Sequence, residues 1–315
     1  MDVFDNIGSN YDYYPNTAIG LCVISYSDIG SIAAEVASQT NLTVVWGPAQ
    51  LVSDFDVTYS LMYAASNAET GECFVVIRGT TFDSAESWLK EDFDIAIPRP
   101  FSALPNLSSN VPTDACISQG TFNGMSDLIS LTDPSTGQYL VDFLADLKPS
   151  HLYVTGHSLG GTLTPTMFAY LNDRLYGGQA VADMNLWSFA GLTPGGAGFN
   201  TYFNSLLHAP DFQWRIQNSL DIAPFCWWSF GDIEQAYIPN GLHWDFAEKD
   251  WAEDLFNDAL KSGIGYSQPQ PGLVMTGTFD HDFPARDIWI EQVLSQHHST
   301  TYQAMVKAQF PSGGS

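Results

Sequence analysis

The chain of 315 residues carries 35 acidic and 10 basic residues, a formal net charge of −25. This charge would repel phosphate backbones and anionic headgroups at long range, which argues against a nucleic-acid partner. The 45% hydrophobic content, with no uninterrupted apolar run of membrane-spanning length, predicts a globular protein with a sizeable core and no transmembrane segment.

The start of the chain and its cysteines bear on compartment and metal content. The opening MDVFDNIGSNYDYY lacks the basic start and apolar core of a secretory signal. The location therefore stays open: we favour an extracellular protein, with a cytoplasmic one as the alternative. The four cysteines form no CxxC pair, and their disulfide status stays open. Without an HExxH motif or a His-Asp cluster, we predict no metal site and no cofactor.

The first half of the chain predicts helices and at least one deeply buried strand. Residues 30–40 have the spacing of a short amphipathic helix. Residues 72–81 form a continuous apolar run closed by Gly-Thr-Thr, typical of a strand buried on both faces, and residues 83–93 read as a capped helix. Residues 98–115 interleave prolines with apolar residues, too irregular for a helix and too apolar for a plain linker. We interpret this segment as a lid or flap.

The second half alternates between strand and helix patterns. Strand patterns occupy residues 152–156, 184–191 and 213–219. Helical patterns occupy residues 120–131, 138–147, 199–207 and 244–263, and two helical pieces flank a histidine pair within 287–310. This alternation predicts a mainly parallel central sheet flanked by helices. Residues 227–285 depart from it, with many aromatics interrupted by Gly and Pro, and we interpret them as a cap insertion within a single α/β domain spanning residues 1–315.

A serine stands where one of these strands turns into a helix, in Gly156-His157-Ser158-Leu159-Gly160. A GxSxG sequence between an apolar strand and a helix is typical of a nucleophile elbow, in which the glycines permit the tight turn and the serine is exposed at its tip. Ser158 is therefore the candidate nucleophile. We expect His157 to pack near the elbow rather than to take part in the chemistry.

The sequence VTGHSLGG, together with VVIRGTT upstream, resembles the class 3 lipases, a branch of the α/β-hydrolase superfamily, over about residues 70 to 225. The resemblance implies an α/β-hydrolase fold with a lid or cap insertion. It also implies an oxyanion hole, with one donor from Thr80 and a second from the backbone N–H of Leu159, at the positive end of the helix. Capping of the following helix is the alternative role of Thr80.

The resemblance also suggests partners for the serine, since the family order is Ser, Asp, His. RIQNSLDIAPF resembles the family pattern of a strand followed by Asp, an apolar residue and Pro, which identifies Asp221 as the acid. HHSTTYQAM resembles the family ending around the base. His298, directly before Ser299, is the first choice, and His297, five residues before Tyr302, is the alternative.

These residues predict a serine hydrolase that cleaves carboxylic esters, a triacylglycerol lipase in the first instance, through an acyl-enzyme on Ser158. A carboxylesterase, a feruloyl-type esterase and a phospholipase A1 are the alternatives, and a non-catalytic lipase-like scaffold is the alternative from another class. We expect a lipid or other ester as the substrate, with interfacial contact to lipid aggregates. The strong negative charge favours neutral glycerides over anionic phospholipids. Acyl-chain length and oligomeric state are not predicted.

Overall fold

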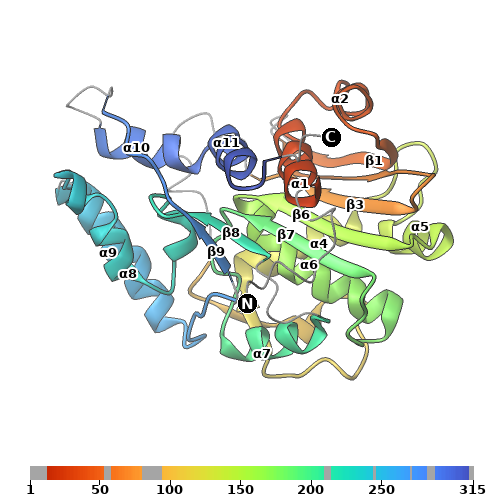
Figure 1. Cartoon of the computed structure of the whole chain (residues 1–315). Coiled ribbons are helices and arrows are strands. Elements are labelled where there is room, and N and C mark those ends of the chain that lie inside the picture. Colours follow the sequence, from red (N-terminus) through yellow and green to blue (C-terminus); the bar gives the residue numbers. More distant parts are fainter. Residues whose placement is uncertain are drawn as a thin grey trace, which may run out of the picture.

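The computed structural model describes residues 13–52, 58–79, 94–208, 214–243, 246–269, 272–281 and 288–311. Among these, a seven-stranded sheet has the order β1-β2-β3-β6-β7-β8-β9 (Figure 1). Its strands are β1 (Thr43–Val52), β2 (Thr58–Ser66), β3 (Glu72–Ile77), β6 (His151–His157), β7 (Met184–Phe189), β8 (Arg215–Asn218) and β9 (Gly272–Met275). The first three strands pair antiparallel, and from β3 to β9 every pairing is parallel. The predicted fold class, a mainly parallel sheet flanked by helices, is confirmed.

Helices cover both faces of this sheet (Figure 1). One face carries α1 (Tyr13–Ile24), α2 (Ile32–Gln39) and α11 (Ser299–Gln309). The other carries α4 (Gln119–Ser130), α5 (Leu140–Leu147), α6 (Leu159–Tyr176) and α7 (Ala197–Leu206). The alternation of side chains along a strand supplies both cores. In β3, Val75 and Ile77 join the core under α6, whereas Phe74 and Val76 join the core under α1.

Helix α1 was not anticipated from the sequence. Ala18, Ile19, Leu21 and Cys22 are buried, so the helix is apolar nearly all round. It packs against the sheet and against α11, and the side-chain amide of Asn16 donates to the carbonyl of Phe310 at 2.7 Å. The first and last described helices therefore pack together on one face of the sheet (Figure 1).

The segment interpreted as a lid or flap, residues 98–115, packs onto the body of the protein. It contains β4 (Pro98–Pro100) and a 3-10 turn, Phe101–Ala103, and leads into β5 (Cys116–Ser118). Phe101 and Val111 are buried in the core beside α6 and α7. The Ser108 N–H and hydroxyl both donate to the carboxylate of Asp173 on α6, at 2.8 and 2.5 Å. Opening of this segment as a lid would break these contacts. The role of residues 98–115 as a lid stays a prediction.

Residues 227–285 were interpreted as a cap insertion, and the described part of them forms a helical lobe beside the sheet and then returns to it. The lobe contains α8 (Phe230–Gln235) and α9 (Phe246–Lys261), and α10 (Ile288–His297) follows it (Figure 1). A separate apolar cluster, which includes Ile222, Tyr237 and Trp289, packs the region after β8 against α10. Strand β9 belongs to the main sheet, which the sequence analysis did not predict. The predicted helix at residues 83–93 lies outside the described residues.

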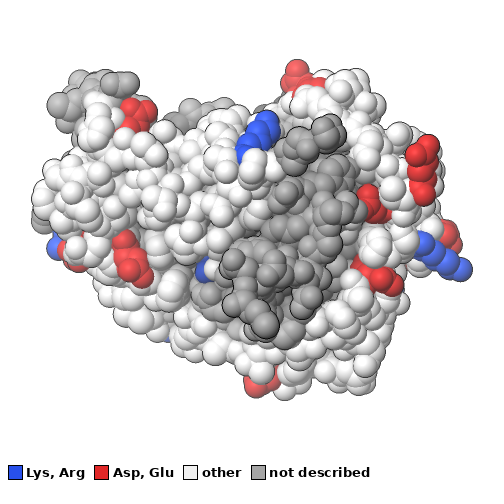
Figure 2. Space-filling view, viewed as in Figure 1, with Lys and Arg blue, Asp and Glu red and all other residues white. Residues whose placement is uncertain are grey.

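Other sequence expectations concern charge, metals, disulfides and membranes. Figure 2 shows acidic side chains spread around the visible face instead of gathered in one patch. All four cysteines are free thiols. Within the described ranges, no cluster of His, Cys, Asp and Glu has the arrangement of a metal site. In the same part of the chain, no helix combines the length and apolar character needed to span a membrane.

Candidate active site

Ser158 occupies a sharp turn between β6 and α6. Its φ of 61° and ψ of −125° lie in a region that residues other than glycine rarely adopt. Its N–H donates to the carbonyl of Phe189 on β7 at 3.0 Å, which fixes the turn to the next strand. Gly160 faces the carbonyl oxygen of Ile77 on β3 so closely that a Cβ would collide with it. The turn therefore holds Ser158 at the carboxyl edge of the parallel strands.

The structure brings Ser158, His297 and Asp221 into one hydrogen-bonded chain. The Nε2 of His297 lies 2.8 Å from the Oγ of Ser158. Its Nδ1 lies 2.9 Å from Oδ2 and 3.1 Å from Oδ1 of Asp221. Because an ionised carboxylate only accepts, Nδ1 carries the ring proton and Nε2 is free to accept the proton of the serine hydroxyl. The exposed fractions of the three residues are 0%, 3% and 0%, so this chain is shielded from water.

Asp221 is held by groups besides the imidazole. The hydroxyl of Tyr302 donates to its Oδ2 at 2.7 Å, and the N–H of Ala223 donates to its Oδ1 at 2.9 Å. Tyr302 in turn accepts from the N–H of Asn218 at 3.0 Å. Burial, together with the charge of Asp221, raises the pKa of Tyr302 well above its ordinary value, so the hydroxyl keeps the proton that it donates. The carboxylate is thereby fixed in position toward His297.

His298, the first choice of the sequence analysis, takes no part in the hydrogen bonds that join Ser158, His297 and Asp221. It is exposed and caps the start of α11, with its Nδ1 2.8 Å from the hydroxyl of Thr300 and accepting from the Thr300 N–H. The alternative, His297, is the histidine in contact with Ser158. The two neighbours differ because residue 297 ends α10 and turns inward, whereas residue 298 is the outward-facing cap of the next helix. The five-residue spacing to Tyr302 was the signal that pointed to His297.

A comparison with protein families matches residues 74–228 to the model described as Lipase (class 3). Over these residues the chain matches the class 3 lipase family. By overall fold it resembles the M37 lipase, at 22% identity, over 96% of this chain and 95% of that one, with a TM-score of 0.72. No curated protein matched in a separate search.

Two fungal lipases share the fold of this protein over a smaller part of the chain. Lip2 lipase of Yarrowia lipolytica matches at 20% identity, over 70% of this chain and 74% of that one, with a TM-score of 0.52. The triacylglyceride lipase of Rhizomucor miehei matches at 15% identity, over 69% and 75%, with a TM-score of 0.50. At these identities the likeness shows the fold alone.

The oxyanion hole expected from the resemblance to class 3 lipases is only partly within the described residues, because Thr80 lies outside them. Its neighbour Gly79 packs against the elbow: a Cβ there would lie 2.5 Å from the carbonyl oxygen of His157 and 3.0 Å from the Cβ of Ser158. Leu159 begins α6, where a backbone N–H has no acceptor within the helix. The assignment of Thr80 and Leu159 as oxyanion donors stays a prediction.

Sequence reasoning gave His157 only a packing role and did not single out Tyr26. The ring of His157 lies between the Tyr26 hydroxyl, 3.0 Å from Nδ1, and the backbone carbonyl of His297, 2.8 Å from Nε2. His157 sits beside the nucleophile in the GxSxG sequence, but nothing in the sequence indicates that Tyr26 reaches His157. Only the docking of α1 on the sheet brings Tyr26 to the elbow.

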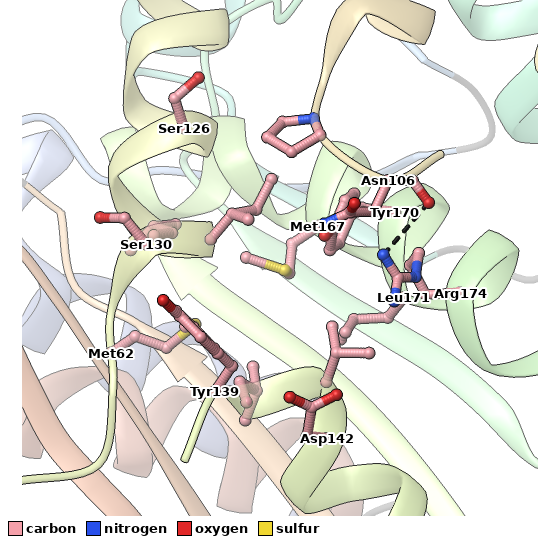
Figure 3. Close-up of a pocket in the computed structure, with 15 residues that line it drawn as sticks. Met62, Asn106, Ser126, Ser130, Tyr139, Asp142, Met167, Tyr170, Leu171 and Arg174 are labelled. Atoms are coloured by element: carbon pink, nitrogen blue, oxygen red, sulfur yellow. Dashed lines mark hydrogen bonds between the residues drawn. The ribbon is translucent and has the colours of Figure 1, made fainter. Parts of the chain in front are cut away.

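A cavity of about 290 Å³ opens between α4, α5 and the middle of α6 (Figure 3). The sulfur atoms of Met62 and Met167 point into it, and Arg174, held by the Asn106 carbonyl, lies at its edge. Met167 is nine residues beyond Ser158 along the chain, which corresponds to about 13 Å of helix. None of the residues that line the cavity belongs to the hydrogen-bonded chain at Ser158. The cavity is therefore not where an ester would meet the serine.

Proposed function

We propose that this protein is a triacylglycerol lipase that works through an acyl-enzyme on Ser158. The observation that carries the proposal is the continuous chain from Ser158 Oγ to His297 Nε2 and from His297 Nδ1 to Asp221, at 2.8 and 2.9 Å. A serine hydroxyl becomes a useful nucleophile when a neighbouring base takes its proton, and these distances permit that transfer.

The chemistry follows from the direction of these hydrogen bonds. As Ser158 Oγ attacks the ester carbonyl carbon, its proton passes to His297 Nε2. Asp221 holds the ring in the tautomer that can accept this proton and stabilises the resulting imidazolium. The imidazolium then protonates the departing alcohol, leaving the acyl group on Ser158. Water, deprotonated by the same nitrogen, attacks the acyl-enzyme and releases the carboxylic acid.

The negative charge that develops on the carbonyl oxygen needs donors on the other side of the elbow. The N–H of Leu159, at the start of α6, and a donor from Thr80 are the groups that we propose for this role. Removal of one such donor typically costs about 2.7 to 4 kcal/mol of transition-state stabilisation.

Two observations favour a neutral lipid as the substrate. The net charge of −25 disfavours anionic lipid surfaces. The full burial of Ser158 means that residues covering it must move before an ester reaches it, which suits a substrate that is presented as an aggregate. Apart from these two observations, the structurally similar protein from Rhizomucor miehei is a triacylglyceride lipase.

The choice of base is tested by two neighbouring substitutions. His297→Ala removes the proton acceptor and should lower kcat by at least about 10³-fold, whereas His298→Ala, the matched control, removes an exposed cap and should leave kcat within about 3-fold. Labelling by a phosphonate ester should occur at Ser158 and disappear in Ser158→Ala. A label on another residue, or full activity of His297→Ala, would contradict the assignment.

The substrate class is tested with esters that differ in aggregation and headgroup. We expect the rate on tributyrin to rise steeply once its concentration passes the solubility limit, and emulsified long-chain triacylglycerol to be hydrolysed. A carboxylesterase would show no such rise, a phospholipase A1 would prefer phosphatidylcholine, and a feruloyl-type esterase would prefer aromatic esters. Absence of all turnover and labelling in the folded protein would favour a lipase-like scaffold.

A further inference from the structure

His157 is a buried, fully hydrogen-bonded residue at the end of β6, directly before the nucleophile. Its Nε2 lies 2.8 Å from the backbone carbonyl oxygen of His297, and its Nδ1 lies 3.0 Å from the hydroxyl of Tyr26. Its ring centre is 5.1 Å from that of His297. One side chain thus joins the turn after α1 to the α10–α11 junction, beneath the elbow.

These partners determine where the protons lie. A carbonyl oxygen only accepts, so Nε2 of His157 is the donor to His297. The ring is neutral, because burial lowers the pKa of His157 well below its ordinary value, and Nδ1 therefore accepts from the Tyr26 hydroxyl. Among the described residues, the titratable side chains facing His157 are Tyr26, His297 and Tyr302, with His298 acting at longer range.

We propose that His157 is a positioning residue for the base: its Nε2–H holds the backbone of His297, and Tyr26 fixes the tautomer that makes this possible. The inference rests on the proposed function, in which His297 takes the proton of Ser158. His157 is not itself a second base, since both of its ring nitrogens are engaged by Tyr26 and by the His297 carbonyl.

The position of His297 explains why such a tie is useful. Residue 297 ends α10, and the last carbonyls of a helix have no N–H partner within the helix. The bond to Asp221 orients the ring of His297, whereas the bond from His157 reaches its backbone, at the junction of two helices. A displacement of a catalytic group by about 1 Å can lower a rate by about 100-fold. The bond from His157 opposes such a displacement of the His297 backbone.

The neutral state of His157 serves the same end. A second proton on the ring would sit on Nδ1, where it would displace the proton of the Tyr26 hydroxyl. It would also place a positive charge beside the His297 ring, which must itself become positive as Ser158 loses its proton. A neutral ring therefore gives a fixed donor without opposing the charge on the base.

The matched pair His157→Gln and His157→Leu tests the donor. The side-chain amide of Gln can reach the His297 carbonyl and donate to it, whereas Leu cannot. We expect His157→Leu to lower kcat by about 10- to 100-fold, with KM within about 2-fold, and to slow phosphonate labelling of Ser158 in parallel. Because a donor is restored, His157→Gln should retain kcat within about 5-fold of the unmodified enzyme. Equal losses in Gln and Leu, or full activity of a folded His157→Leu, would overturn the inference.

A second matched pair tests the tautomer and does not depend on His157→Leu folding. Tyr26→Phe removes the hydroxyl that faces Nδ1 and should lower kcat by about 3- to 10-fold at unchanged KM. Tyr63→Phe is the control, since Tyr63 is a buried tyrosine whose hydroxyl donates to a backbone carbonyl away from the site, that of Leu21 at 2.8 Å. Its kcat should not change, and equal effects of the two substitutions would refute the role of Tyr26.

Failure of the inference and failure of the proposed function give different results. If the unmodified protein neither hydrolyses esters nor labels at Ser158, the proposed function is wrong. If it does both, and His157→Leu does so at the same rate, the function stands and the positioning role of His157 falls.

Discussion

The backbone at Ser158 predicts an unusual order of stability between two inactive variants. With φ at 61° and ψ at −125°, the residue carries a Cβ where glycine is the favoured residue, a strain of about 1 to 3 kcal/mol. Ser158→Ala keeps the Cβ, and Ser158→Gly removes it. Both variants lose the hydrogen bond between Oγ and His297, so that loss cancels when they are compared.

The magnitude follows from two opposing terms. Removal of the Cβ relieves about 1 to 3 kcal/mol of strain. Glycine gives back about 0.5 to 1 kcal/mol, because its unfolded backbone has more freedom to lose. We therefore expect Ser158→Gly to exceed Ser158→Ala in free energy of unfolding by about 1 kcal/mol.

Equilibrium unfolding in urea, followed by tryptophan fluorescence, measures this difference through the midpoint and slope of the transition. Ser188 supplies the control: it is a buried serine on β7 whose φ lies outside the positive range. There the order should reverse, with Ala more stable than Gly by about 0.5 to 1 kcal/mol. If Ala were as stable as Gly at position 158, the turn would not be strained, and the argument from its dihedral angles would fail.

Three further results are expected. Tyr302→Phe removes one of the three donors to Asp221, the hydroxyl that bonds to Oδ2, and should lower the free energy of unfolding by about 1 to 3 kcal/mol together with kcat, as measured by urea unfolding and steady-state kinetics; unchanged values would refute this support. Gly160→Ala drives a Cβ into the carbonyl of Ile77 and should cost about 3 kcal/mol or more, read as a lower urea midpoint, with unfolding at the unmodified midpoint as the contrary result. Because the pKa of His157 is lowered in the folded state, only the unfolded chain takes up its proton below about pH 6.5. The stability from this residue is therefore present above that pH and lost as the pH falls below it. The free energy of unfolding should therefore fall less steeply with decreasing pH in His157→Gln than in the unmodified protein. An equally steep fall in both would contradict the neutral state assigned to His157.

The features that the sequence predicted well are those in which a short motif determines its own local backbone conformation. GxSxG between an apolar run and a helix indicated the elbow, because the sharp turn at Ser158 brings Gly156 and Gly160 so close to other backbone atoms that neither has room for a Cβ. The continuous apolar run of residues 72–81 indicated a central strand for a similar reason, since only burial on both faces suits it.

The features that it missed depend on packing between distant segments. Helix α1 is buried nearly all round, so it lacks the alternation of apolar and polar faces by which helices are recognised. Strand β9 has four residues and becomes a strand through its pairing with β8. The choice between His297 and His298 depended on which residue of a helix junction faces inward, and adjacent residues carry no pattern that decides this.

The packing of α11 against α1 makes activity depend on the completeness of folding. Ser158 and Asp221 are placed by the sheet, but His297 arrives only with the α10–α11 junction, and Tyr302 lies on α11 itself. Tyr26, on the opposite side of His157, is in place only when α1 has docked. A partly folded chain with an intact sheet would therefore hold Ser158 without its base. Its hydroxyl would then react with esters no faster than an ordinary surface hydroxyl. The contacts of α1 and α11 that complete the fold are therefore also the contacts that place the base beside Ser158.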